Sequence, residues 1–138
     1  MNGEPATSSL TDDELLARFI LFKRYIRDNG RRVAPEAFVP HPTRELSVKR
    51  HLGLTEAELW GCGQEIADRR PATLYGRADV QVVAVTRQSL RCVATRTPRN
   101  HVNIVGWPAE KPAQKVIAMA LAGAAAYTAN PAAPPTPA

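Results

Sequence analysis

Four short runs rich in β-branched residues occupy much of the chain between residues 74 and 105, and polar links separate them. Runs of this kind are typical of strands, and short links between them favour antiparallel neighbours. In the last run we expect Val102 and Ile104 to face the core and His101, Asn103 and Val105 to face away. The four runs, expected in one largely antiparallel sheet, are 74–75, 80–85, 90–93 and 101–105.

A further strand is predicted at residues 45–50, where polar and apolar residues alternate and Leu46 and Val48 would face inward. The segment before it, 31–43, contains three prolines and shows no helical period. We expect it to be an extended connection over the core, anchored by Val33, Phe38 and Val39.

Helix start signals occur twice. Thr11 and Glu14 have the spacing of a capping box and predict a helix from Thr11 to the turn at Asn29-Gly30. The same signature recurs at Thr55 and Glu58, and it predicts a second helix from Thr55 to about Asp68.

A third helix is expected to begin near Pro112, since proline suits the first turn of a helix. Together these elements predict an α+β fold, with about three helices on a mostly antiparallel sheet of four to five short strands. The expected organisation is a flexible N-terminus (1–10), one domain (11–127) and a disordered Ala/Pro-rich tail (128–138).

The chain shows neither the pattern of a secretory signal nor an apolar run long enough to span a bilayer. We therefore expect a soluble, cytoplasmic protein without membrane contact. Its two cysteines, Cys62 and Cys92, lie thirty residues apart and predict reduced thiols rather than a disulfide or zinc site.

Positive charge is concentrated in two segments. Residues 18–50 carry nine Lys and Arg against three acids, and residues 81–108 carry four Arg and no acid. This distribution favours a polyanionic partner, either a nucleic acid or an acidic protein surface. Trp107 is a candidate partner anchor, with core packing as the alternative. The other candidate binding residues are Arg31, Arg32, Arg44, Lys49, His51, Arg96 and Arg99.

His101, Arg50 and Asn103 are the candidate catalytic residues, because a histidine beside an arginine and an amide suits acid–base work on a phosphorylated substrate. The alternative for His101 is a structural histidine that bonds a loop. Lys49 and Arg50 would equally suit a solvated edge strand. Because metal-ligand spacings and a glycine-rich phosphate loop are missing from the sequence, we expect neither a metal nor a cofactor.

Several segments are similar to an uncharacterised group of small bacterial proteins, and the similarity spans most of residues 15–122. It implies no established activity. The segments that carry it are Phe38-Val-Pro-His41, Glu45-Leu-Ser-Val48, Leu52-Gly-Leu-Thr-Glu-Ala-Glu-Leu-Trp60, Leu74-Tyr-Gly-Arg-Ala-Asp79 and His101-Val-Asn-Ile-Val-Gly-Trp-Pro108.

Two of the strands also resemble, over a short stretch each, those of ADP-ribosyltransferase-like toxin domains. One strand ends at Arg50 and the other begins at His101. This resemblance implies that the two residues share a site.

Three functions follow as hypotheses. The leading one is a non-enzymatic binding protein for a polyanionic partner. The second is an enzyme or toxin-like domain that acts on a nucleotide or phosphorylated substrate, and the third is an accessory subunit of a larger bacterial assembly.

Overall fold

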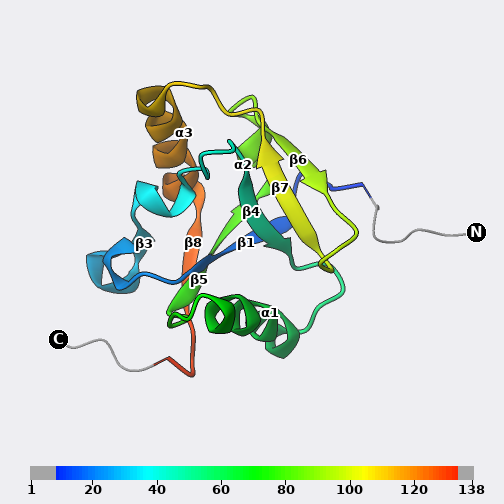
Figure 1. Ribbon diagram of the computed structural model, residues 1–138, viewed down its shortest axis with the longest axis vertical. Coiled ribbons are helices and arrows are strands. Elements are labelled where there is room, and N and C mark those ends of the chain that lie inside the picture. The colour runs from blue at the N-terminus through cyan, green and yellow to red at the C-terminus, as the bar shows by residue number, and fades with distance from the viewer. Residues whose placement is uncertain (1–8, 134–138) are drawn as a thin grey trace, which may run out of the picture.

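A computed structural model describes residues 9–133 and shows an α+β fold built on a six-stranded sheet (Figure 1). The strands lie in the order β6-β7-β4-β1-β5-β8, and every neighbouring pair is antiparallel. The strands are β1 (Leu15–Ile20), β4 (Leu46–Arg50), β5 (Gly76–Gln81), β6 (Arg91–Ala94), β7 (His101–Val105) and β8 (Ala126–Ala129).

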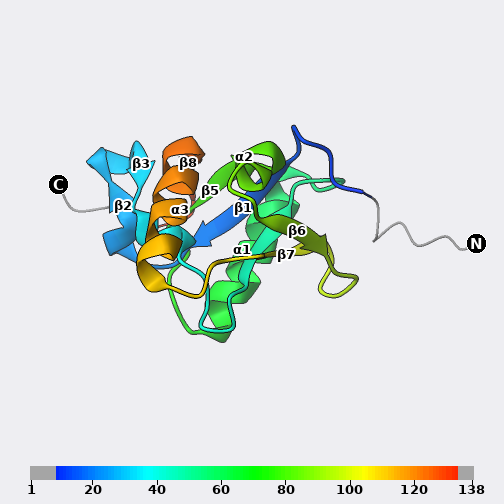
Figure 2. The ribbon, with the colours of Figure 1, turned by 90° about the horizontal axis from the view of Figure 1, so that it is seen from above.

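Three α-helices accompany this sheet: α1 (Glu56–Arg69), α2 (Val82–Thr86) and α3 (Lys111–Ala124). A second, two-stranded sheet pairs β2 (Ile26–Arg27) with β3 (Arg32–Val33). This hairpin lies beside α3 and β8 at one end of the molecule (Figure 2). Two short 3-10 helices flank the hairpin, η2 (Lys23–Tyr25) and η4 (Pro35–Phe38), and a third, η3 (Asp28–Gly30), forms its turn.

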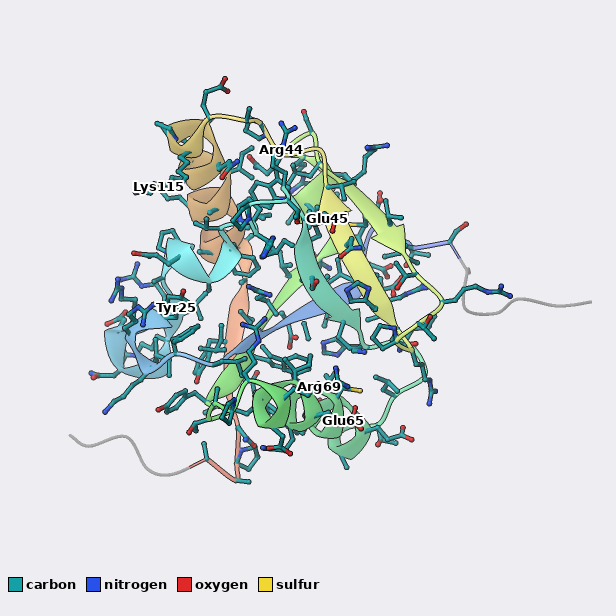
Figure 3. The ribbon with its side chains drawn as sticks, viewed as in Figure 1. Tyr25, Arg44, Glu45, Glu65, Arg69 and Lys115 are labelled. Atoms are coloured by element: carbon teal, nitrogen blue, oxygen red, sulfur yellow. The ribbon has the colours of Figure 1, made fainter. Side chains whose placement is uncertain are left out.

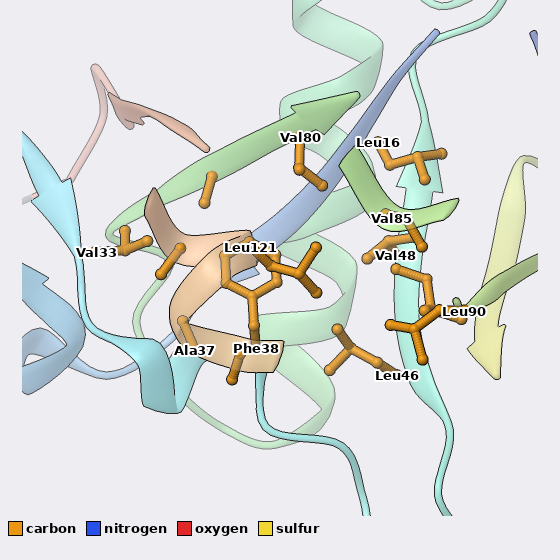
Figure 4. Close-up of a cluster of buried hydrophobic side chains, with 14 of the residues drawn as sticks. Leu16, Val33, Ala37, Phe38, Leu46, Val48, Val80, Val85, Leu90 and Leu121 are labelled. Atoms are coloured by element: carbon orange, nitrogen blue, oxygen red, sulfur yellow. The ribbon is translucent and has the colours of Figure 1, made fainter. Parts of the chain in front are cut away.

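The hydrophobic core lies between the sheet, η4, α2 and α3 (Figure 4). Leu16, Phe38 and Leu121 reach it from β1, η4 and α3, and each is fully buried. Burying one such side chain contributes roughly 1.5–3 kcal/mol. The opposite face of the sheet is covered by α1, where Gly63 lies against the ring of Phe19 from β1.

Several expected elements are confirmed. Thr55 caps α1, accepting a hydrogen bond from the Glu58 amide at 3.1 Å while its own amide donates to the Glu58 carboxylate at 2.9 Å. Val102 and Ile104 of β7 are fully buried, as their alternation predicts. Strands β4 and β7 fall within the expected segments, β6 lies one residue later than expected, and α3 begins at Lys111, next to the expected Pro112.

The helix expected from Thr11 to Asn29 is wrong, because residues Leu15–Ile20 form β1, an inner strand between β4 and β5. An inner strand buried on both faces has a nearly continuous apolar run, which also fits helical spacing. Thr11 and Glu14 form a turn instead, with the Glu14 amide donating to the Thr11 carbonyl at 3.1 Å. Asn29 is left-handed, as expected, but it lies in the turn of the β2–β3 hairpin.

The strand expected over residues 80–85 is wrong in part. Strand β5 ends at Gln81, and residues Val82–Thr86 form α2. Val82 and Val85 lie three residues apart on the buried side of this helix, so tertiary packing overrides the β preference of valine. Residues 9–133 contain eight strands in two sheets, which exceeds the four to five expected.

Ordered structure continues to Ala129, because β8 pairs with β5 along the edge of the sheet. The hydroxyl of Tyr127 donates to the carbonyl of Tyr75 at 3.2 Å and secures this strand. The expected flexible N-terminus and disordered tail fall partly on residues 1–8 and 134–138, which lie outside the described residues. Within the described part of the chain, each helix is too short or too polar to cross a bilayer.

Candidate anion-binding groove

Two adjoining hollows form one depression beside β4, which we call the basic groove. The inner cavity has a volume of about 150 Å³ and lies between β1, β4, β7 and α1. The outer groove has a volume of about 1070 Å³ and extends from η2 past the loop before β4 to α3. Five residues line both hollows: Arg18, Phe22, Tyr25, Ser47 and Arg70. Figure 3 labels six lining residues, which come from η2, the loop before β4, α1 and α3.

The inner cavity exists because two neighbouring strands separate. Strand β1 pairs with β4 at two positions, Leu16 with Arg50 and Ala17 with Lys49. Beyond these positions the guanidinium of Arg18 lies between the strands and donates to the Ser47 carbonyl at 3.0 Å. Its Nε donates to the Ala37 carbonyl of η4 at 2.8 Å. Arg18 thus replaces backbone pairing between the two strands and bridges the gap.

The lining of the basic groove is strongly positive. It contains seven Lys and Arg side chains against three Glu, together with His41 and His101. Within residues 9–133, none of the seven cations has a carboxylate oxygen within 4.0 Å. The seven are Arg18, Arg44, Lys49, Arg69, Arg70, Lys111 and Lys115.

Two of these cations are held in partly desolvated positions. Lys49 is 6% exposed, and its Nζ donates to the Arg99 carbonyl at 2.6 Å. Burial lowers the pKa of Lys49. Burial, and next the charge of Arg70, lower the pKa of Arg18 to about 10. Carbonyl partners bring no negative charge, so a bound anion would favour the charged forms of both side chains.

His101 lies opposite Lys49 in the pairing of β7 with β4 and also lines the inner cavity. Its Nδ1 is 2.8 Å from the hydroxyl of Thr95 in the loop after β6, which orients the ring. Burial and then the charge of Lys49 lower the pKa of His101, which favours the neutral imidazole.

The structure brings together two of the three candidate catalytic residues. His101 and Asn103 lie on one face of β7, and Asn103 accepts a hydrogen bond from Ser47 at 3.5 Å. Arg50 lies on the opposite face, because it follows Lys49 directly in β4 and adjacent strand residues alternate. There it forms a buried ion pair with Glu14. Arg50 and His101, which the toxin-like resemblance would place in one site, are therefore on opposite sides of the sheet.

The other candidate binding residues are dispersed. Lys49 and Arg44 line the basic groove, and β4 is an inner strand rather than the edge strand considered from the sequence. Trp107 is 4% exposed, packs in the core and donates from Nε1 to the Ile104 carbonyl at 3.0 Å. The remaining four lie elsewhere: Arg31 and Arg32 in the β2–β3 hairpin, and Arg96 and Arg99 in the loop between β6 and β7.

His51 belongs to a different cluster near the start of α1. Its Nε2 lies 2.8 Å from Asp79, which also accepts from Arg77 Nε at 3.0 Å. Arg77 donates to both carboxylate oxygens of Glu56 and lies 4.7 Å from the ring centroid of Trp60. Burial disfavours the charge on Arg77, but the hydrogen bonds to Glu56 and Asp79 outweigh it and raise the pKa. The cation of this cluster therefore has two carboxylate partners, whereas the cations of the basic groove have none within 4.0 Å in the described residues.

Arg18, Arg69 and Arg70 are groove residues that the sequence does not single out as site candidates. The helix wrongly expected over 11–29 would place Arg18 on a solvent-facing surface. A lone arginine inside the apolar run Leu-Leu-Ala-Arg-Phe-Ile is the signal that could have identified it. Arg69 and Arg70 form a basic pair at the end of α1 and enter the site through the tertiary fold.

Within residues 9–133, no three His, Cys, Asp or Glu side chains are grouped as ligands for a metal ion. Comparisons of the chain with known protein families, curated proteins and solved structures found no match. Its function is therefore inferred from the residues of the groove.

Proposed function

We propose that this protein binds a polyanionic partner along the basic groove and that the partner is a single strand of nucleic acid. The observation that carries the proposal is the set of seven groove cations without carboxylate partners within residues 9–133. Cations arranged along a groove attract a phosphate backbone through charge alone, and their binding releases condensed counterions.

Two aromatic rings in the same groove favour nucleic acid over an acidic protein surface. Phe22 is 40% exposed, and its ring centroid lies 5.2 Å from that of the half-buried Tyr25. The Arg24 guanidinium lies 4.6 Å from the Phe22 centroid and 5.1 Å from the Tyr25 centroid, so a base would stack beside this cation or in its place. Both residues line both hollows. Bases stack on exposed aromatic rings without requiring a particular sequence, and proteins that bind single strands combine such rings with basic grooves. An acidic protein segment would need the cations but not the rings.

The shape of the groove favours a single strand over a duplex. Its lining is concave, and the inner cavity continues beneath α1. An unpaired strand can turn individual bases and phosphates into such hollows, whereas a duplex keeps its bases stacked. Within this proposal the protein acts in the cytoplasm, where Cys62 and Cys92, both free thiols in the structure, stay reduced.

Fluorescence anisotropy with labelled single-stranded DNA and RNA over a series of salt concentrations tests the proposal. Arg69→Gln/Arg70→Gln removes two exposed groove cations, and Arg87→Gln/Arg91→Gln removes two exposed cations that do not line it. For each cation removed that binds a phosphate, the slope of log K against log salt should fall in magnitude by about 0.7. We expect this in the groove variant, whereas the control keeps the slope of the unaltered protein.

Absence of binding to DNA and RNA at low salt would reject the proposal. Polyglutamate serves as a model of an acidic protein segment. If it binds as tightly as the oligonucleotide, and if the groove variant binds it more weakly, the partner is an acidic protein instead. Gel electrophoresis of the recovered oligonucleotide tests one form of the enzymatic alternative, cleavage of the strand, because a binding protein leaves its length unchanged.

A further inference from the structure

The inner cavity is too small for a nucleotide and large enough for one phosphate group. Its volume of about 150 Å³ matches that of an engineered protein cavity that accepts benzene. Pockets for whole drug-sized ligands start at about 300 Å³. The cavity joins the outer groove through the five shared residues, so a ligand that extends along the groove can place one terminal group inside it.

The donors in this cavity are only partly used. Lys49 Nζ carries three N–H donors, and one is directed to the Arg99 carbonyl. Arg18 carries five, and two are directed to the carbonyls of Ala37 and Ser47. Glu65, the one acid in the lining, lies beyond 4.0 Å from any cation of the described residues. Arg69 and Arg70 add two exposed charges from the end of α1.

A phosphate monoester suits this set of donors better than an internal phosphodiester does. A monoester carries a charge of about −1.5 to −2 at pH 7 and presents three terminal oxygens, so it can accept from Arg18 and Lys49 at once. A diester carries a single charge and must lead the chain out of the cavity on both sides.

We propose that the inner cavity binds the terminal phosphate monoester of the strand in the outer groove, through Arg18 and Lys49, with Arg69 and Arg70 contributing charge. This inference rests on the proposed function. It means that the protein binds strands with a phosphorylated end more tightly than strands that end in hydroxyls. His101, 2.8 Å from Thr95 and opposite Lys49, forms the wall beside the phosphate.

The test compares oligonucleotides of one sequence that carry a 5′-phosphate, a 3′-phosphate or hydroxyls at both ends, with the fluorophore attached internally. The unaltered protein should bind one phosphorylated form about tenfold more tightly than the hydroxyl form, which is the effect of one charge-assisted hydrogen bond. Lys49→Gln should reduce this ratio to near one, and the Arg87→Gln control should keep it.

Equal affinity of the unaltered protein for all three oligonucleotides overturns the end-binding inference but leaves the proposed function intact. No binding to any of them rejects both. This comparison needs no variant, so it remains decisive if Lys49→Gln fails to fold. A mononucleotide 5′-phosphate is the final competitor. If it competes as strongly as the phosphorylated oligonucleotide, the ligand is a small phosphomonoester, and the assignment to a strand end is overturned.

Discussion

Lys49 and His101 face each other across the paired strands β4 and β7, and both line the inner cavity. Each is partly withdrawn from water, and the charge of Lys49 adds to burial in lowering the pKa of His101. The positive charge of the cavity comes from Arg18, Lys49, Arg69 and Arg70, and none of these four has a carboxylate oxygen within 4.0 Å in the described chain. Partly buried positive charge without an opposite charge nearby raises the free energy of the free protein, and a bound anion would lower it.

The neutral state of His101 predicts a pH dependence of stability. Its pKa in the folded protein lies below the ordinary value of 6.5, so the unfolded chain takes up a proton more readily. The stability it contributes is complete above pH 6.5 and is lost as the pH falls from there through the lowered pKa. Urea denaturation between about pH 8 and pH 5 should show a smaller loss of stability for His101→Gln. Parallel curves for the two proteins would contradict this account.

Gly63 lies where α1 packs closely against Phe19 of the sheet. A Cβ there would be 2.6 Å from one carbon of the Phe19 ring and 3.1 Å from Leu74 Cδ2. Gly63→Ala should therefore lower the free energy of unfolding by about 1–3 kcal/mol.

Gly61 provides the matched control in the same helix, because, apart from its chain neighbours and the backbone of its own helix, a Cβ there has no heavy atom of the described residues within 4 Å. Gly61→Ala should raise the free energy of unfolding by up to about 1 kcal/mol, since alanine is the better helix former. Thermal denaturation measures both changes. Equal effects of the two substitutions would show that α1 does not pack against Phe19.

The Arg77–Asp79 pair has a structural role. Both side chains are largely buried, and Asp79 also binds His51. Asp79→Asn should reduce the free energy of unfolding by about 3 kcal/mol, because it leaves Arg77 with one carboxylate partner in a buried position. Glu56→Gln removes the partner whose side chain is 66% exposed and should cost less than about 1 kcal/mol. A small effect of Asp79→Asn would instead favour a functional role for the cluster.

Cys92 is predicted to be an unreactive thiol. Burial, and next the charge of Glu14, raise its pKa from 9.0 to about 11. In a Cys62→Ser variant, labelling with a disulfide reagent at about pH 8 should be roughly a hundredfold slower in the folded protein than in urea, since the thiolate is the reacting form. Similar rates in the two conditions would show that the thiol is accessible and ionised.

The elements that the sequence predicts well are those whose signals are local. The capping box at Thr55 and Glu58 and the alternation from His101 to Val105 each depend on a few neighbouring residues. The errors occur where the signal depends on distant partners. Residues 15–20 form an inner strand because β4 and β5 pair with it on either side. The residues of the segment do not themselves indicate that these two strands will pair with it.

The groove is only partly predictable for the same reason. Lys49 and Arg44 can be identified from the charge of the chain segment around β4. The fold adds three further lining residues, because β1 separates from β4 and α1 packs beside them: Arg18, Arg70 and Tyr25. The distribution of charge along the sequence does not predict these tertiary contacts. The same fold places Arg50 on the other side of the sheet from His101.

The most direct test of the central claim is to map the contact surface by ¹H–¹⁵N correlation spectra during titration with a single-stranded oligonucleotide. If the basic groove binds the strand, the largest shifts should fall on backbone amides of the groove, including Arg18, Ser47, Lys49 and Arg70. Shifts confined to the rival basic surfaces, the β2–β3 hairpin with Arg31 and Arg32 or the β6–β7 loop with Arg96 and Arg99, would contradict the account.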